Sequence, residues 1–241
     1  MKIKVIGSGD MWTTNNSASY LIDNKLLIDI PNGTCKELKR NKINPMNIDH
    51  VLITHLHGDH YFDIPFYLLN KTYLKNRRQT NIYTTKSGKR KIIKLFFLAF
   101  PNSYINLINK TKLNFVTKQN FNIENYNIKK VKVDHGILHD AYGYIIEQEN
   151  IKIGFTGDAR ISKKIEYMAS ICDHLFCDCT RIKGNKRHMG FDNIIYLRNK
   201  YPNCKFYTSH MNDKTRKYIK ENRENNIIVL EDYKTYNLKK W

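Results

Sequence analysis

The sequence lacks any apolar run near the roughly 18 residues that a membrane-spanning helix requires. Residues 1–6 also lack the long apolar core and the small-residue cleavage site of a signal peptide. These absences exclude a membrane-spanning protein and predict a cytosolic one. A chain of 241 residues can bury one sizeable core, so we expect a single domain over residues 1–241.

Cysteine is scarce, and its five copies are odd in number and scattered, which disfavours a disulfide framework. Cys177 and Cys179 stand two apart and would share one face of a strand. We interpret them as small buried hydrophobic side chains. A thiolate metal site is the alternative, but a richer set of metal ligands occurs elsewhere in the chain.

Acidic residues are few: 22 Asp and Glu stand against 41 Lys and Arg, which gives a formal net charge of +19. Such a charge attracts anionic partners. The abundance of Lys, Asn and Ile also fits the compositional bias of an AT-rich genome. The charge therefore supports an anionic substrate without identifying it.

Strand-like and helix-like segments alternate along the chain, with no strict repeat and no flexible linker. Strands are expected at 2–7, 18–23, 25–30, 50–54, 81–84, 128–134, 142–147, 151–155, 174–178, 205–208 and 227–230. Helices are expected at 34–41, 61–74, 87–100 (capped by Ser87), 162–169, 190–200 and 213–222. Residues 102–127 receive no assignment. This order predicts a four-layer αββα sandwich of two sheets back to back, with functional groups on loops at one edge.

The densest chemical signal lies directly after the expected strand 50–54. His55, His57, Asp59 and His60 offer three imidazoles and a carboxylate within six residues, and Gly58 would allow a sharp turn. Nitrogen and oxygen ligands of this kind suit Zn²⁺, and also Mn²⁺ or Fe²⁺. The segment predicts a metal site rather than a merely solvated loop.

This short segment cannot complete two metal sites, but three further candidates follow expected strands: His135, Asp158 and His210. Gly157 would let the backbone turn tightly before Asp158. Each of the three alone would be an ordinary loop residue. Together, and in this order after the first cluster, they suggest the remainder of a metal site.

The chain resembles the metallo-β-lactamase fold superfamily over nearly its full length. The resemblance implies a first metal held by His55, His57 and His135, and a second held by Asp59, His60 and His210. It further implies that Asp158 bridges both ions and that Asp29, after Leu27-Ile28, holds the histidine loop in place.

With an aspartate at the bridging position, the chain resembles the branch of the superfamily that cleaves phosphodiesters, thioesters or lactones. Antibiotic-hydrolysing members often have cysteine at that position. Two divalent ions about 3.5–4 Å apart can clamp the attacking and leaving oxygens and activate a water. On this interpretation Asp59 belongs to the catalytic set as well as to the metal ligands.

Asp178 ends an expected strand, and His188 follows ten residues later. The pair resembles the proton relay of ribonuclease Z and its phosphodiesterase relatives, in which a carboxylate orients a histidine that protonates the leaving oxygen. A surface histidine before a helix is the alternative. Asp178 stands where many relatives have glutamate.

The chain lacks the protruding arm with a Gly-x-Pro tip that ribonuclease Z uses to grip transfer RNA. His139 lies in an insertion after His135 and is interpreted as a loop histidine. The segments 6–12 and 16–20 resemble small cyclic-nucleotide phosphodiesterases, including anti-Pycsar proteins.

These patterns predict a two-metal phosphodiesterase, with Zn²⁺ first and Mn²⁺ or Fe²⁺ as alternatives. Its expected substrate is a small anionic diester, first of all a cyclic nucleotide. By analogy with its relatives, the protein is expected to be a homodimer.

An RNA-processing nuclease is a second hypothesis, and it would use Arg181, Lys183, Lys186 and Arg187 to follow a phosphate backbone. A lactone or thioester hydrolase, which would not need His188, is a third hypothesis. A non-enzymatic nucleotide-binding protein is the fourth.

Overall fold

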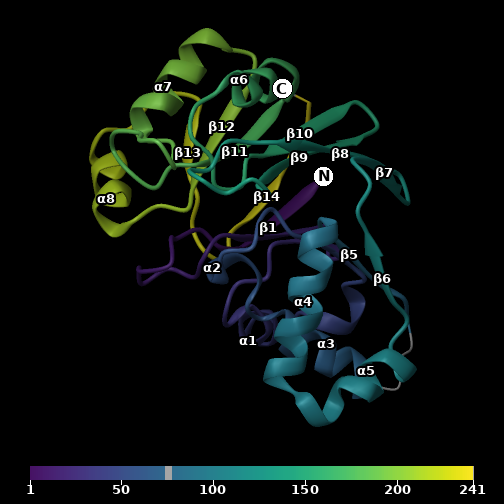
Figure 1. Cartoon of the computed structure of the whole chain (residues 1–241). Coiled ribbons are helices and arrows are strands. Elements are labelled where there is room, and N and C mark those ends of the chain that lie inside the picture. The colour runs from purple at the N-terminus through teal and green to yellow at the C-terminus, as the bar shows by residue number, and fades with distance from the viewer. Residues whose placement is uncertain (74–77, 241) are drawn as a thin grey trace.

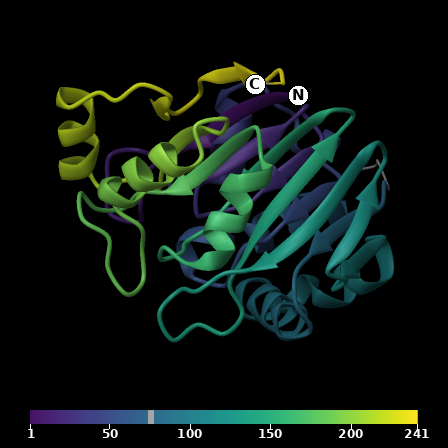
Figure 2. The same cartoon turned by 90° about the horizontal axis from the view of Figure 1, so that it is seen from above.

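The strands of the chain form two sheets that lie against each other in a computed structural model, which describes residues 1–73 and 78–240. Over these residues each sheet has seven strands, in the orders β14-β1-β2-β3-β4-β5-β6 and β13-β12-β11-β10-β9-β8-β7. Helices α3, α4 and α5 lie on one outer side, and α6, α7 and α8 on the other (Figure 1). Figure 2 shows the green and teal strands of the second sheet crossing in front of the purple and blue strands of the first. The predicted αββα sandwich is confirmed.

The first sheet is built mainly from the N-terminal half of the chain. Its strands are β1 (Lys2–Gly7), β2 (Ser19–Ile22), β3 (Leu26–Ile28), β4 (His50–Leu52), β5 (Thr80–Tyr83), β6 (Leu113–Val116) and β14 (Thr235–Asn237). A tight turn joins β2 to β3 because Asp23 and Asn24 both take positive φ values, 46° and 59°. From β3 to β6 the strands run parallel, so their carboxyl ends meet at one edge.

The second sheet contains β7 (Asn120–Ile123), β8 (Tyr126–Lys132), β9 (Tyr142–Gln148), β10 (Ile151–Phe155), β11 (His174–Asp178), β12 (Lys205–Ser209) and β13 (Ile227–Val229). Strand β9 is antiparallel to both β8 and β10, and β10 to β13 are parallel. The ends of β8, β10, β11 and β12 therefore lie at the same edge. His135, Asp158, Asp178 and His210 occur at or just after these ends.

The helices are α1 (Thr34–Arg40), α2 (Gly58–Tyr61), α3 (Ile64–Tyr73), α4 (Lys86–Ala99), α5 (Tyr104–Lys110), α6 (Lys163–Ile171), α7 (Phe191–Lys200) and α8 (Asp213–Glu221). The expected helix 61–74 corresponds to α3, whereas Tyr61 is the last residue of α2 and Leu74 lies outside the described residues. The cap of α4 was predicted wrongly: Thr85, not Ser87, precedes the helix and accepts a hydrogen bond from the Gly88 amide at 2.9 Å.

Apolar side chains from the facing sides of the two sheets form the central core. Tyr20 of the first sheet packs against Phe155 of the second with ring centroids 5.0 Å apart, and Phe176 stacks on Tyr207 at 4.5 Å. Two further buried clusters lie between each sheet and its own helices. This packing fixes both sheets on each other, and so it fixes the positions of the polar loops at their common edge. No helix among the described residues is long and apolar enough to cross a membrane.

Candidate metal centre

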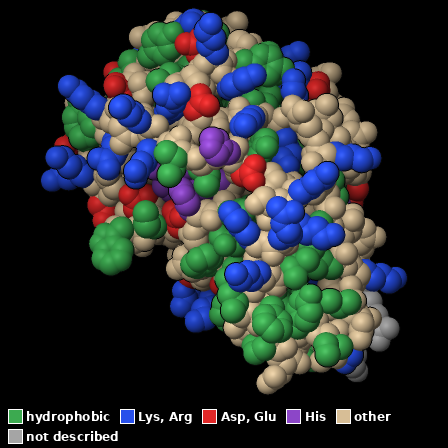
Figure 3. Space-filling model, in the orientation of Figure 1, with side chains coloured by type: hydrophobic (Ala, Val, Ile, Leu, Met, Phe, Trp, Pro, Cys, Tyr) green, Lys and Arg blue, Asp and Glu red, His purple; other side chains and the backbone are tan. Residues whose placement is uncertain are grey.

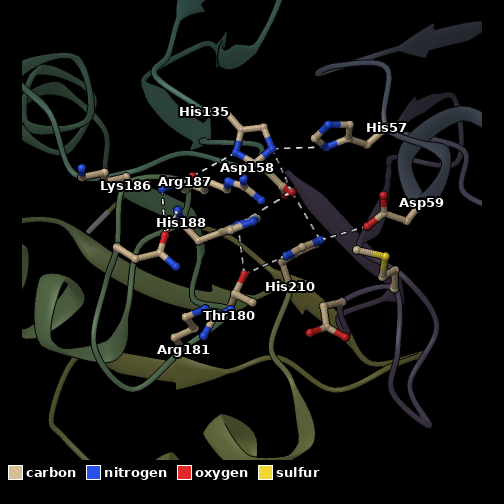
Figure 4. Close-up of a pocket in the computed structure, with 13 residues that line it drawn as sticks. His57, Asp59, His135, Asp158, Thr180, Arg181, Lys186, Arg187, His188 and His210 are labelled. Carbon is tan, nitrogen blue, oxygen red and sulfur yellow. Dashed lines mark hydrogen bonds and ion pairs between the residues drawn. The ribbon is translucent and has the colours of Figure 1, made fainter. Parts of the chain in front are cut away.

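Three imidazoles meet at the edge shared by the two sheets. His55 Nε2 lies 3.0 Å from His57 Nδ1, and His135 Nε2 lies 3.2 Å from the same atom. His55 and His57 follow β4 of the first sheet, whereas His135 follows β8 of the second. Together with Asp158 their ligand atoms lie within 4.8 Å of one another. Residues 78 positions apart in sequence thus form one potential cation site (Figure 4).

A second group of ligand atoms adjoins the first and contains Asp59, His60 and His210. His210 Nε2 lies 3.3 Å from Asp59 Oδ2, and His60 Nε2 lies 3.7 Å from the same oxygen. Asp158 stands between the two groups. Its Oδ1 is 3.3 Å from His60, and its Oδ2 is 3.5 Å from His210 and 3.8 Å from His55. The position of Asp158 is the one that a bridging carboxylate would need.

The outward-facing nitrogens of His60 and His135 are held by oxygens that can only accept a hydrogen bond. His60 Nδ1 donates to Asp29 Oδ2 at 2.8 Å, and His135 Nδ1 donates to the Arg187 carbonyl at 2.9 Å. The Nε2 atom of each neutral ring must then carry a lone pair. Both lone pairs face the centre of the cluster.

Two threonines fix His55 and His210 in the same way. The Thr54 hydroxyl donates to Asp29 at 2.7 Å and therefore accepts from His55 Nδ1 at 3.1 Å. The Thr180 hydroxyl donates to Asp178 at 2.7 Å and accepts from His210 Nδ1 at 2.9 Å. In the neutral form of each ring Nε2 again keeps its lone pair and faces inward. Partners of this kind set the tautomer and orientation of metal-binding histidines.

The electrostatics of the cluster favour added positive charge. Burial opposes ionisation of Asp158, but the neighbouring His210 and His60 outweigh it and hold the pKa of Asp158 well below its usual value. Burial likewise disfavours charge on His210, yet Asp158 and Asp59 raise its pKa to about 9. Burial and the neighbouring His60 keep the pKa of His55 well below 6.5. Asp158 thus stays ionised beside the neutral His55 imidazole, and the raised pKa of His210 shows that the cluster stabilises a positive charge, which a divalent cation would supply in exchange for that proton.

The donor set fits divalent cations on a second ground. His60 Nε2 is fully buried and has no hydrogen-bond partner in the described part of the chain. A buried polar nitrogen without a partner costs about 1–3 kcal/mol. Its neighbours within 4 Å include Asp59 and Asp158, whose oxygens would repel the lone pair of the neutral ring. Burial lowers the pKa of His60, but Asp158 and Asp29 outweigh it and raise the pKa well above its usual value, so this nitrogen favours a positive charge. A cation between these atoms would remove both costs.

His188 approaches the cluster from the loop between β11 and α7. Its Nδ1 lies 2.8 Å from Asp178 Oδ2 and 3.9 Å from Asp158 Oδ2, and its ring stacks on His210 with centroids 5.5 Å apart. Burial lowers the pKa of His188, but the hydrogen bond and charge of Asp178 outweigh burial and raise it. The structure therefore brings together the pair predicted as a proton relay.

Asp178 is itself held rigidly. One of its oxygens accepts from the Ala159 amide at 3.0 Å, and the other accepts from the amide and hydroxyl of Thr180 at 3.1 and 2.7 Å. Sequence reasoning missed Thr180, which links Asp178 to His210 and His188. A threonine two residues after the strand-ending aspartate was the available signal.

A pocket of about 500 Å³ opens over the cluster. Its floor includes His57, Asp59, Asp158 and His210, and the loop after β11 forms a basic wall, lined by Arg181, Asn185, Lys186, Arg187 and His188. On the surface the histidines lie in a hollow with Lys and Arg side chains around it (Figure 3). A volume of this size suits a small molecule.

Two glycines predicted to serve turns have different roles. Gly157 has φ 58°, and a Cβ there would stand 2.9 Å from Thr54 Cβ, so only glycine fits this turn before Asp158. Gly58 begins α2 instead of making a left-handed turn. A Cβ on Gly58 would meet the Phe62 ring at 2.8 Å, so its role is to admit that ring.

The cysteines and His139 lie outside the cluster. Cys177 and Cys179 are buried in the apolar layer beside the second sheet, and all five cysteines are free. His139 is exposed and belongs to none of the ligand groups found among the described residues.

Known proteins match both the sequence and the fold of this chain. A family described as "Anti-Pycsar protein Apyc1" matches residues 1–236. Ribonuclease Z of Thermococcus sibiricus is 35 % identical over 133 residues, which cover 54 % of this chain and 40 % of that protein. Ribonuclease Z of Clostridium novyi is 30 % identical over 185 residues, which cover 66 % and 58 %. The chain thus matches only about two fifths of the length of the Thermococcus protein.

Solved structures share the fold along almost the whole chain. The metallo-β-lactamase fold protein YhfI from Bacillus subtilis has a TM-score of 0.78 at 17 % identity and covers 98 % of each chain. A diphosphatase from the PhnP family has a TM-score of 0.77 at 20 % identity, covering 99 % of this chain and 98 % of that one. The short form of human tRNase Z has a TM-score of 0.76 at 15 % identity, covering 99 % and 100 %.

The fold and the sequence matches place the chain in the ribonuclease Z-like branch of the metallo-β-lactamase fold superfamily. Within that superfamily, the match over residues 1–236 shows that the chain belongs to the anti-Pycsar protein Apyc1 family. The predicted superfamily and family resemblance are both confirmed.

Proposed function

We propose that this protein is a two-metal phosphodiesterase that hydrolyses a small phosphodiester, first of all a cyclic nucleotide. One observation carries the proposal: histidine lone pairs and ionised carboxylates converge below a basic pocket, directly beside the His188–Asp178 pair. The membership of the anti-Pycsar family supports a nucleotide substrate.

In this proposal His55, His57 and His135 would hold one ion, and Asp59, His60 and His210 would hold the other, with Asp158 available to both. Zinc is the proposed ion because imidazole and carboxylate ligands suit it, although Mn²⁺ and Fe²⁺ accept the same donors. When bound, a pair of divalent ions polarises a phosphoryl group and supplies a nucleophile at neutral pH.

His188 is the proposed general acid. Its Nδ1 donates to Asp178, so in the protonated ring Nε2 carries the second proton, and no partner for Nε2 is found among the described residues. His188 also lines the pocket. The raised pKa keeps this proton available near neutral pH, where a leaving alkoxide oxygen needs it.

The basic wall is proposed to bind the phosphate. Arg181, Lys186 and Arg187 line the pocket, and all three side chains are exposed. They attract an anionic diester and offer donors to its non-bridging oxygens. The pocket size favours one nucleotide over a folded RNA, but the ribonuclease Z relatives support RNA processing as the second candidate.

The test is a substrate panel of cyclic nucleotides, a transfer-RNA precursor, a lactone and bis(p-nitrophenyl) phosphate. Each is incubated with protein loaded with Zn²⁺, loaded with Mn²⁺, or stripped by a chelator. We expect metal-dependent cleavage of cyclic nucleotides well above the other natural substrates. Efficient removal of the transfer-RNA 3′ trailer without cleavage of cyclic nucleotides would replace the proposal by the RNA-processing one. His139→Ala is the matched control for histidine substitutions, because His139 lies outside the cluster.

We also propose a homodimer. Large apolar side chains are exposed on α3, α4 and α5: Phe66, Tyr73, Phe97, Leu98, Ile105 and Ile108. Figure 3 shows apolar surface over the lower part of the molecule, where α3, α4 and α5 lie in Figure 1. A second copy of the chain would cover this face. Sedimentation of the wild type and of Leu98→Glu should give a dimer and a monomer, and a monomeric wild type would contradict the proposal.

A further inference from the structure

The pocket has one wall without basic residues, formed by the loop between β1 and β2. Asp10 and Met11 of this loop line the pocket, and Trp12 follows them directly. Met11 is 73 % exposed and Trp12 is 90 % exposed, which makes them among the most exposed large apolar residues of the described chain. Exposed apolar side chains at the mouth of a polar cavity mark a ligand-binding surface.

The loop is fixed at its base beside the metal centre. Gly9 bridges to both Ser17 and Met211, and the Asp10 amide donates to the Met211 carbonyl at 3.2 Å. Met211 directly follows His210. At the tip, the Trp12 amide donates to Asp10 Oδ1 at 2.9 Å, which holds Trp12 next to the pocket-lining residues. The backbone of Trp12 is thus held beside Asp10 and Met11, which line the pocket, and its indole is exposed to solvent.

The two walls of the pocket differ in chemistry. Arg181, Lys186 and Arg187 suit a phosphate, whereas the Met11 thioether, with the indole of the adjacent Trp12, suits a flat apolar ring. The Asp10 carboxylate adds an acceptor that would repel a phosphate but can receive a hydrogen bond from an amine or hydroxyl. A nucleotide carries both parts, a phosphate at one end and a ring with donors at the other.

We infer that residues 10–12 form the nucleoside-binding wall of the pocket and that Trp12 stacks on the nucleobase. This inference rests on the proposed function, which supplies the phosphodiester substrate. It adds Trp12 as the residue that distinguishes nucleotides from simple diesters. Stacking of a base on an aromatic side chain changes affinity roughly 5- to 100-fold.

The kinetic test compares two esters with the same leaving group: the p-nitrophenyl ester of thymidine 5′-monophosphate and methyl p-nitrophenyl phosphate. Trp12→Ala should lower kcat/KM for the nucleoside ester roughly 5- to 100-fold, mainly through KM, and leave the methyl ester unchanged. Trp12→Tyr should retain most of the activity because it keeps an aromatic face. Tyr196→Ala, an exposed aromatic residue on α7, is the control and should change neither ester. Equal losses on both esters would overturn the inference.

A binding test separates this inference from the proposed function, because it needs no turnover. The chain has two tryptophans, so in Trp12→Phe only Trp241 emits. Adenosine monophosphate should quench the fluorescence of the wild type and not that of Trp12→Phe, and ribose 5-phosphate should quench neither. Quenching with no cleavage of any diester would support the nucleoside wall and refute the phosphodiesterase. Cleavage of cyclic nucleotides without quenching would refute the nucleoside wall alone.

Discussion

The floor and the walls of the pocket are built on different principles. In the metal centre that forms and underlies the floor, His55, His60, His135 and His210 are held from behind by an oxygen partner, and their inner nitrogens converge. On the walls, Arg181, Lys186 and Met11 are exposed, on loops. Buried ligand nitrogens that are held in fixed positions suit chemistry that requires precise geometry. Exposed side chains suit recognition, since they can adjust to a substrate at little cost to the fold.

This contrast predicts that substitutions on the floor act on metal content and turnover, and that substitutions on the walls act on affinity. The largest effect is expected for Asp158, which contacts both ligand groups. Asp158→Ala should lose at least one divalent ion per chain and more than about 10³-fold of kcat/KM. Metal analysis and kinetics measure both losses. Asp213→Ala, an exposed aspartate on α8, is the control. Full metal content and activity in Asp158→Ala would remove the proposed site.

His188 should show a large effect that depends on the leaving group. His188→Ala should lose about 10²–10⁴-fold on a cyclic nucleotide, whose alkoxide leaving group needs a proton. The loss on bis(p-nitrophenyl) phosphate should be much smaller, because nitrophenolate leaves without help. Metal content should stay unchanged. Equal losses on both substrates would indicate a substrate-binding role, and a metal-depleted variant would make His188 a ligand.

Asp178 should show its role in the pH profile. Burial lowers the pKa of His188, while the hydrogen bond and charge of Asp178 raise it. The protonated ring is the proposed acid, so activity is lost as pH rises through this pKa. Asp178→Asn removes the negative charge, so the pKa should fall and the basic limb of kcat/KM should move to lower pH. If the basic limb of kcat/KM does not move, a group other than His188 sets the pKa of that limb.

Asp29 should have an intermediate effect, since it touches no proposed ion and acts through its neighbours. It accepts from the Thr54 amide and hydroxyl and from His60 Nδ1. Asn can adopt its positive φ of 56°. Asp29→Asn should therefore fold, with an unchanged far-ultraviolet spectrum, but lose about 10- to 100-fold in metal affinity. Unaltered metal affinity would show that Thr54 alone positions the loop.

The smallest effect is expected on the basic wall. Lys186 is exposed and lines the pocket, and unlike Arg187 it supplies no carbonyl to His135. An exposed charge pair contributes about 0–1 kcal/mol, so Lys186→Gln should raise KM up to about 5-fold with kcat unchanged. Salt screens exposed charges, so the difference from wild type should shrink at high ionic strength. A fall in kcat would show that Lys186 contributes to turnover, as the floor residues are expected to do.

Much of the architecture followed from short-range patterns. The strands from His174 and Lys205 were predicted because their apolar residues are continuous and bounded by polar ones. Residues 102–127 could not be assigned, although they contain α5, β6 and β7. Strand β6 is an edge strand with half-buried residues, so it has no strong alternation. Strand β14 was missed because three residues, Thr235–Asn237, become a strand only by pairing with β1.

The sequence by itself determined the kinds and order of the site residues, because ligand chemistry depends on side-chain identity and on the strand ends at which they occur. It indicated His55, Asp158, His188 and their companions before any distance was known. Only the tertiary structure decided which nitrogen faces inward, because that depends on partners remote in sequence, such as the Arg187 carbonyl behind His135. The tertiary structure also decided that Asp10 and Met11 line the pocket beside the metal centre, since the bridge from Gly9 to Met211 joins segments about 200 residues apart.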